Sequence, residues 1–268
     1  MSGVPAMACY AFRDGIVEET YSQHVDGIIE CMAKSWEFRA LTAKLSRLLH
    51  IEREEIRRLI ALSAILHDIG KLERGKQDEC TRTGCTRFEY HYAISARVAS
   101  SLAHDVSLTI RNDDMQALLS GRGLDDRESL AFYVLVLLPI LLHHYAQITE
   151  ESLDEAVRKT RHLEIFEVHE CCRRVLGDLL ERHVLSDARE SGLAFKLARR
   201  LKDLLDRAEV VRLSALPFSS RSGGRSVDEL FAYQFSEWKY AIEAVTGILN
   251  MCDGRVAFRH RARQNPVP

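Results

Sequence analysis

The sequence has little net charge and no leader-like opening. With 37 basic and 39 acidic side chains among 268 residues, its formal net charge is only -2. A wholly basic nucleic-acid-binding surface is therefore not indicated, and any such contact would need a local patch. No basic-apolar-small signal peptide opens the chain. The strongly apolar stretch at residues 127–146 is of borderline length for a membrane span, but Arg127, Glu128 and the histidine pair near its end favour a buried core helix. We therefore expect a cytoplasmic protein.

The sequence also lacks convincing strand alternation, internal repeats and low-complexity tracts, although apolar residues recur at helical spacing along most of it. Hydrophobic residues make up 46% of the chain and charged residues 28%, a balance typical of a globular protein with a large core. The pattern predicts an all-α fold with one helical domain over residues 21–254. A short lead over residues 1–20, with a turn at Gly15, would precede this domain, and a basic tail over residues 255–268 would follow it.

Cysteine is present but scattered along the chain. The odd number and irregular spacing do not look like the disulfide framework of a secreted protein. Two of the thiols bracket a predicted polar loop over residues 73–87, where they could form a disulfide or hold zinc, although zinc would need a second pair nearby. An intracellular disulfide is more plausible in a hyperthermophile. The seven residues are Cys9, Cys31, Cys80, Cys85, Cys171, Cys172 and Cys252, and Cys80 and Cys85 are the pair that brackets the loop.

Residues 60–75, with the sequence IALSAILHDIGKLERG, organise the rest of the prediction. The apolar run ends in His67 and Asp68, which lie four and three residues before Lys71, so a continuous helix would carry all three on one face. Gly70 lets the backbone turn or approach a ligand closely. Burying a carboxylate costs several kcal/mol unless it is paired, hydrogen-bonded or bound to metal. A divalent metal explains this stretch most directly.

Other residues of metal-ligand type lie on predicted helices or at their ends. Two of them, His143 and His144, are adjacent and follow a strongly apolar helix that Pro139 should kink. Further along the chain, a flexible loop is predicted over residues 217–226. Any one of these histidines alone is more simply explained as a core or surface residue, but together with His67 and Asp68 they form a set. Imidazole and carboxylate suit Mn, Fe, Co, Ni or Zn. The further candidates are His24, His91, His143, His144 and Asp253.

In the order of these residues the sequence resembles the HD superfamily of metal-dependent phosphohydrolases. Within that superfamily, the paired histidines and the closing NMCDGRVAFR resemble the CRISPR-associated HD nuclease of type I interference systems. The chain has no Walker A or other helicase motif, and its length resembles the stand-alone HD subunit that works with a separate helicase. The resemblance covers about residues 20 to 260. It implies a single HD-domain helical bundle around a buried metal site.

The resemblance also implies two divalent transition-metal ions, drawn from Mn, Ni, Co or Fe, with Mg possible. A carboxylate shared between cations about 4 Å apart would offset part of their repulsion, and the ions would lower the pKa of a bound water. Lys71 would contact a phosphate oxygen or the bridging hydroxide. One ion would be held by His24, His67, Asp68 and Asp253, and the other by Asp68, His91, His143 and His144, so that Asp68 bridges.

The main hypothesis is a nuclease that hydrolyses phosphodiester bonds of single-stranded DNA in CRISPR interference, an antiviral defence. Its partners would be a separate helicase subunit and an RNA-guided surveillance complex. Two alternatives stay open: an HD phosphohydrolase acting on a nucleotide or cyclic dinucleotide, and a non-catalytic subunit. A basic cluster after Asp253 could steer a phosphate backbone toward the site, or could be only a solvated terminus. This cluster consists of Arg255, Arg259, Arg261 and Arg263.

Overall fold

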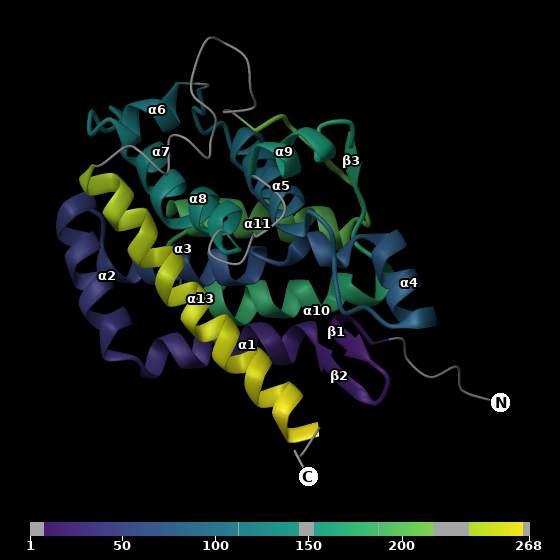
Figure 1. Cartoon of the computed structure of the whole chain (residues 1–268). Coiled ribbons are helices and arrows are strands. Elements are labelled where there is room, and N and C mark those ends of the chain that lie inside the picture. Colours follow the sequence, from purple (N-terminus) through teal and green to yellow (C-terminus); the bar gives the residue numbers. More distant parts are fainter. Residues whose placement is uncertain (1–7, 112, 145–152, 187, 217–235, 265–268) are drawn as a thin grey trace.

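The structure is a computed structural model that describes residues 8–111, 113–144, 153–186, 188–216 and 236–264, with side chains described as far as residue 260. Within these ranges the chain is a bundle of helices accompanied by two small two-stranded sheets, so the predicted all-α fold class is confirmed (Figure 1). None of the described helices has both the length and the apolar character that crossing a membrane would require. The flexible loop predicted at residues 217–226 lies outside the described residues.

Helices account for most of the described residues, and the strands between them are short. Along the chain the elements are β1 (Tyr10–Asp14), β2 (Val17–Thr20), α1 (Tyr21–Lys34), α2 (Trp36–Leu49), α3 (Arg53–Leu66), the 3-10 turn η1 (Ile69–Leu72), α4 (Arg74–Thr83), α5 (His91–Asp105), α6 (Asp114–Leu119), α7 (Arg127–Phe132), the π-helical η2 (Tyr133–Leu137), α8 (Leu138–Leu142), α9 (Leu153–Thr160), β3 (Ile165–Phe166), α10 (Glu170–Leu180), the π-helical η3 (Glu181–Leu185), α11 (Leu193–Asp206), β4 (Val211–Arg212) and α13 (Glu237–Gln264).

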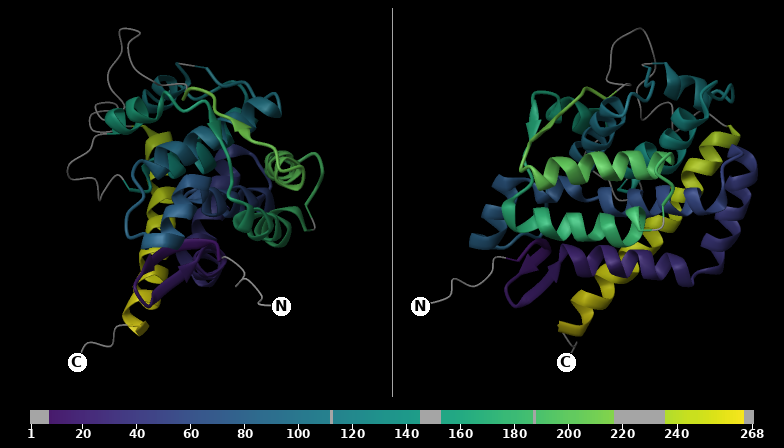
Figure 2. Two further views of the ribbon diagram at one scale, coloured as in Figure 1. Left: turned by 90° about the vertical axis from the view of Figure 1, so that its right-hand side faces the viewer. Right: turned by 180° about the vertical axis from the view of Figure 1, so that it is seen from behind.

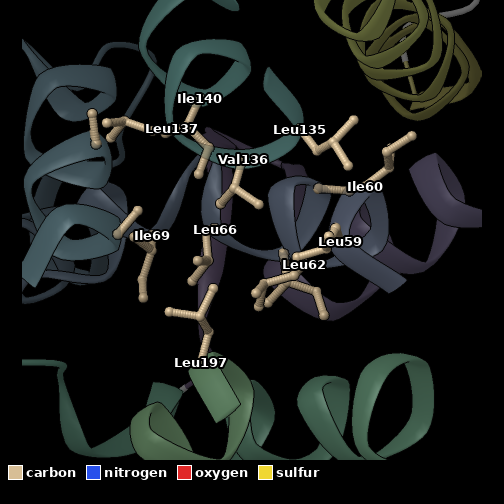
Figure 3. Close-up of a cluster of buried hydrophobic side chains, with 14 of the residues drawn as sticks. Leu59, Ile60, Leu62, Leu66, Ile69, Leu135, Val136, Leu137, Ile140 and Leu197 are labelled. Atoms are coloured by element: carbon tan, nitrogen blue, oxygen red, sulfur yellow. The ribbon is translucent and has the colours of Figure 1, made fainter. Parts of the chain in front are cut away.

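α3 forms the centre of the bundle, and all its residues from Leu59 to Leu66 are buried. Figure 3 shows side chains of its second half, among them Leu62 and Leu66, between those of η2 and α8 on one side and Leu197 of α11 on the other. Each such side chain contributes about 1.5–3 kcal/mol when it is removed from water. A helix that is apolar all round must be enclosed. The functional residues at its C-terminal end are therefore held by the best-packed part of the molecule.

Longer helices close the bundle around α3. α10 and α11 lie side by side behind it, and α13 runs obliquely across α1 and α8 (Figures 1 and 2). α13 continues without a break beyond residue 254 as far as Gln264, so the first ten residues of the predicted basic tail are helical. At the other end of the domain, the expected start at residue 21 coincides with the junction of β2 and α1.

The N-terminal lead contains a strand pair that the sequence pattern did not predict. β1 and β2 are antiparallel, with Asp14 opposite Val17 across a turn in which Gly15 has a φ of 58°, as expected for that glycine. The expectation that the chain has no strands is wrong here and at the short β3–β4 pair. These strands have only two to five residues each, too short for a period of two to stand out. β2 ends at Thr20, which caps α1 in a capping box with Gln23.

The apolar stretch before the histidine pair is divided into α7, η2 and α8. Pro139 has no backbone N–H, so it cannot supply the helical bond to the carbonyl four residues earlier. The π-helical segment η2 ends two residues before Pro139, and the Leu138 N–H donates to the Tyr133 carbonyl five residues back. The expected disturbance at Pro139 takes this form. Because a π turn accommodates one extra residue, it also resets the direction in which His143 and His144 leave the helix end.

Six of the seven cysteines are paired in disulfides, and of the two roles left open for Cys80 and Cys85 the structure has the disulfide. The bonds are Cys9–Cys172, Cys31–Cys252 and Cys80–Cys85, and Cys171 is free. Two of them join residues 163 and 221 positions apart, a separation at which sequence spacing carries no signal. The predicted polar loop at residues 73–87 contains α4, and the disulfide joins the last turn of α4 to the segment after it.

The Cys31–Cys252 bond ties α1 to α13 and should stabilise the fold by restricting the unfolded chain. We expect Cys31→Ser to lower the free energy of unfolding by about 2–4 kcal/mol. The control Cys171→Ser, which removes the free thiol, should cost less than about 1 kcal/mol. Urea unfolding followed by circular dichroism measures both changes. Equal stabilities of the two variants would contradict the cross-link.

Candidate metal centre

Seven imidazole and carboxylate side chains converge at the C-terminal end of α3. They form two groups, and within each group one ligand atom per residue lies within 4.8 Å of all the others. They come from α1, the end of α3, the start of α5, the end of α8 and α13. The first group is His24, His67 and Asp253, and the second is Asp68, His91, His143 and His144. The structure thus brings together every residue that the sequence nominated as a metal ligand.

Asp68 lies between the two groups and is only 2% exposed. Its Oδ1 faces the second group, 3.0 Å from His91 Nε2 and 3.5 Å from His143 Nε2. Its Oδ2 faces the first group, 3.3 Å from His67 Nε2 and 3.6 Å from His24 Nε2. One carboxylate oxygen is therefore directed at each group, which is the arrangement a bridging ligand requires.

Three of the histidines are oriented by the same local contact. The Nδ1 atoms of His67, His91 and His143 lie 2.8, 2.5 and 2.6 Å from the carbonyl oxygens of Ala64, Phe88 and Ile140, in each case three residues earlier. A carbonyl only accepts, so Nδ1 must carry the hydrogen and donate it. In the neutral ring this leaves Nε2 with its lone pair, directed at the centre of the site.

The residues fit a metal centre because their inward-facing atoms have no other hydrogen-bond partner. Among the described residues, His24 Nε2, His67 Nε2, His143 Nε2 and Asp68 Oδ1 are buried and make no hydrogen bond of acceptable geometry. Each such group would cost about 1–3 kcal/mol if nothing satisfied it. His91 Nε2 and His144 Nε2 face each other at 3.0 Å, as two ligands of one ion would. The nitrogen and oxygen donors match divalent first-row transition metals.

The electrostatics of the first group are those of an ion pair. Burial lowers the pKa of His24, but the adjacent carboxylates of Asp253 and Glu19 outweigh it and raise that pKa to about 9. Burial alone would raise the pKa of Asp253, but the contact with His24 and the charge of His67 hold it below its usual value. In the metal-free protein, the proton on His24 therefore takes the place of a cation.

In the second group the imidazoles are neutral. Burial lowers the pKa of His91 to about 4 and that of His144 to about 3. Burial would raise the pKa of Asp68, but the charges of His67 and Lys71 keep it well below its usual value. At neutral pH this group thus offers unprotonated nitrogens and an ionised carboxylate, which is the form that binds metal.

Comparison with known proteins agrees with this geometry. A family model described as Cas3, HD domain matches residues 22–253 of the chain. The match covers most of the sequence and includes both residue groups. The protein belongs to the Cas3 HD-domain family. It is accordingly a CRISPR-associated HD nuclease domain, a metal-dependent hydrolase. No curated protein matches the chain.

The backbone of this Cas3 HD domain differs from expectation at the key motif. α3 ends at Leu66, and His67 and Asp68 lie between it and the 3-10 turn η1. The prediction of one continuous helical face through Lys71 is therefore wrong. Lys71 still reaches Asp68, because η1 places its Nζ 2.6 Å from Asp68 Oδ2. The break is stabilised by the hydroxyl of Tyr21, which donates to the Ile65 carbonyl at the end of α3.

Gly70 allows two backbone segments to approach each other closely. A Cβ at this position would lie 2.3 Å from the carbonyl oxygen of His91. The Gly70 N–H donates to Ser95 Oγ of α5 at 2.9 Å. The close contact expected at this glycine is therefore with the start of α5, and it sets the distance between Asp68 and His91.

One buried group beside the Cas3 HD site was missed by the sequence analysis. Glu19 of β2 is 1% exposed, and its Oε1 lies 2.9 Å from His24 Nδ1. The sequence analysis assigned it to the N-terminal lead, outside the predicted helical domain, and so did not consider it as part of the site. The available signal was its spacing: Glu19 falls two residues after the apolar Val17 and directly before the cap of α1, so strand alternation would have placed it on the buried side.

The arginines of the C-terminal cluster are not brought to the metal centre in the same way. Arg255 and Arg259 are exposed and lie about 200° and about 240° around α13 from Asp253. They face Glu37 and Glu30 closely enough to interact electrostatically. The backbone at Arg261 and Arg263 is helical, and their side chains lie outside the described part.

The approach at Gly70 gives a direct test of the backbone geometry. We expect Gly70→Ala to lower the free energy of unfolding by at least about 2 kcal/mol, since both neighbouring backbones would have to move. Gly75→Ala is the matched control, because Gly75 is also helical and a Cβ there meets nothing within 4 Å. The control should be neutral or stabilised by up to about 1 kcal/mol. Thermal unfolding of the metal-free proteins measures both, and equal effects would contradict the contact.

The protonation states predict how metal uptake depends on pH. Because the pKa of His24 is about 9, this ring carries a proton at pH 7 that a metal must displace. His91 and His144, with pKa values of about 4 and about 3, are already unprotonated. Filling both groups at pH 7 should release at least the proton of His24, and affinity at the His24 group should rise with pH up to about 9. Calorimetry in buffers of different ionisation enthalpy measures this, and release of no proton would contradict it.

Proposed function

We propose that this protein is a nuclease that uses two metal ions to hydrolyse phosphodiester bonds in single-stranded DNA. The observation that carries the proposal is the position of Asp68, whose two oxygens face two separate groups of ligands. A carboxylate between two cations fixes their separation and reduces their mutual repulsion. Two-metal sites with ions about 3.5–4 Å apart are typical of nucleases and other enzymes of in-line phosphoryl displacement.

In this proposal His24, His67 and Asp253 hold one ion and His91, His143 and His144 hold the other, with Asp68 shared. The bound ions would be Mn, Ni, Co or Fe, or else Mg, and they would lower the pKa of a water molecule and stabilise charge on the attacking and leaving oxygens. The protein contributes fixed geometry. Hydrogen bonds at Nδ1 hold the rings, and burial of most ligands excludes bulk water.

The substrate would approach from the side where the site is least buried. The side chains of Lys71 and Asp253 are 15% and 18% exposed, whereas those of His67 and His143 are fully buried. Lys71 is held by Asp68 and lies over the Phe88 ring. From there its ammonium group can contact a phosphate oxygen of the scissile bond. It would compensate the negative charge that accumulates during displacement.

A longer strand would extend beyond this opening. Because Arg255 and Arg259 are rotated away from Asp253, we assign them to the backbone of the strand at a distance from the reacting bond, and we extend that role to Arg261 and Arg263. In this function, a separate helicase subunit would supply single-stranded DNA, guided by an RNA-containing surveillance complex during CRISPR interference. The family membership supports this context.

Removing the shared carboxylate tests the proposal. We expect Asp68→Asn to lower the cleavage rate of circular single-stranded DNA with Mn²⁺ by about 10²–10³-fold or more. Asp178→Asn is the control, because Asp178 is an exposed carboxylate on α10 that belongs to neither group. It should cleave at the rate of the unmodified protein. Undiminished cleavage by Asp68→Asn would overturn the assignment. Turnover of nucleotides or cyclic dinucleotides, without DNA cleavage, would favour the small-substrate phosphohydrolase instead.

A further inference from the structure

The side chain of His24 is oriented by a different kind of hydrogen-bond partner from the one that orients the other histidines. The Nδ1 atoms of His67, His91 and His143 each contact a neutral backbone carbonyl in the preceding turn. His24 Nδ1 instead contacts the Glu19 carboxylate, five residues earlier and on another element. The second oxygen of that carboxylate, Oε2, is buried and has no hydrogen-bond partner among the described residues. Burying a carboxylate costs free energy, so a carboxylate buried against one imidazole is expected to have a role at that ring.

Glu19 is held in place by the hairpin and the start of α1. On β2, Glu18 is exposed and pairs with Arg13, while Glu19 points inward. β2 passes directly into α1 through the Thr20 cap, so a few residues of fixed backbone separate the carboxylate from the ring. Thus the hairpin outside the predicted helical domain reaches the metal centre through one side chain.

Glu19 cannot act as a ligand of the same ion as His24. It lies at Nδ1, whereas Asp253 Oδ1 and Asp68 Oδ2 lie 3.2 and 3.6 Å from Nε2 on the opposite side of the ring. A carboxylate that accepts the Nδ1 hydrogen fixes the tautomer that presents Nε2 to the metal, and it increases the electron density of the ring. A backbone carbonyl also fixes the tautomer, but it contributes no charge.

We propose that Glu19 is a positioning residue for only one of the two metal ions, the one held by His24, His67 and Asp253. The inference rests on the proposed metal centre, and it implies that the two ions differ in the number of carboxylates around them. Around the first ion, the carboxylates of Asp253 and Glu19 add to the shared Asp68. The second ion has Asp68 and three neutral imidazoles. Removal of Glu19 should therefore weaken binding of the first ion and leave the second unchanged.

The test measures Co²⁺ binding by calorimetry and visible absorption in proteins reduced to one site. The His91→Ala/His144→Ala background retains the His24 group, and the His67→Ala/Asp253→Ala background retains the His91 group. In the first background, Glu19→Ala should weaken Co²⁺ binding by about 10- to 100-fold. Glu19→Gln should lose less, because its amide oxygen can still accept from Nδ1. In the second background, neither change should alter the affinity.

The matched control is Glu18→Gln, the neighbouring carboxylate on the exposed side of β2, which should change neither affinity. Equal Co²⁺ affinity of Glu19→Ala and its parent in the first background would overturn the inference. So would an equal loss in both backgrounds, which would indicate general damage to the fold. If neither parent binds Co²⁺, the metal centre itself fails, and the inference fails with it. If both bind but the unmodified protein leaves DNA intact, only the proposed reaction fails and the role of Glu19 stands.

Discussion

The burial of one carboxylate, Asp68, is the constraint on which the rest of the structure depends. It lies at the end of the central helix with 2% of its surface exposed, and the nitrogens of four imidazoles and one ammonium group lie within 3.6 Å of its oxygens. In an apolar interior such a charge is tolerable only with this much compensation. Much of the surrounding architecture positions the groups that provide it.

Several features of the backbone serve this purpose. α3 ends at Leu66, so that His67 and Asp68 lie in the short connection between α3 and the 3-10 turn η1. Gly70 lets the start of α5 come close, and the π-helical segment before Pro139 sets the direction of the histidine pair. The disulfide at Cys252 anchors α13 next to Asp253. Each is a local departure from regular helix or a cross-link between helices, and each helps to position a residue of the site.

The sequence was sufficient for those parts of the protein whose signal is local or ordered along the chain. Helical periodicity predicted the fold class, and the order of histidines and aspartates indicated the family. It also nominated the seven residues that converge. It could not reveal the break after Leu66, because an apolar run followed by His67 and Asp68 has the same pattern in a helix that continues as in one that ends. Nor could it reveal the pairing of Cys31 with Cys252, which depends on how α1 and α13 pack. Glu19 was missed because its strand has only four residues and its importance comes from a ring on the next element.

The central claim is that Asp68 bridges two ions, and electron paramagnetic resonance of the Mn²⁺-loaded protein tests it most directly. A bridging carboxylate brings the ions to about 3.5–4 Å, close enough for their spins to couple. We predict two Mn²⁺ ions per chain with the spectrum of an exchange-coupled pair. A single ion per chain, or two ions with the spectrum of isolated Mn²⁺, would contradict the account.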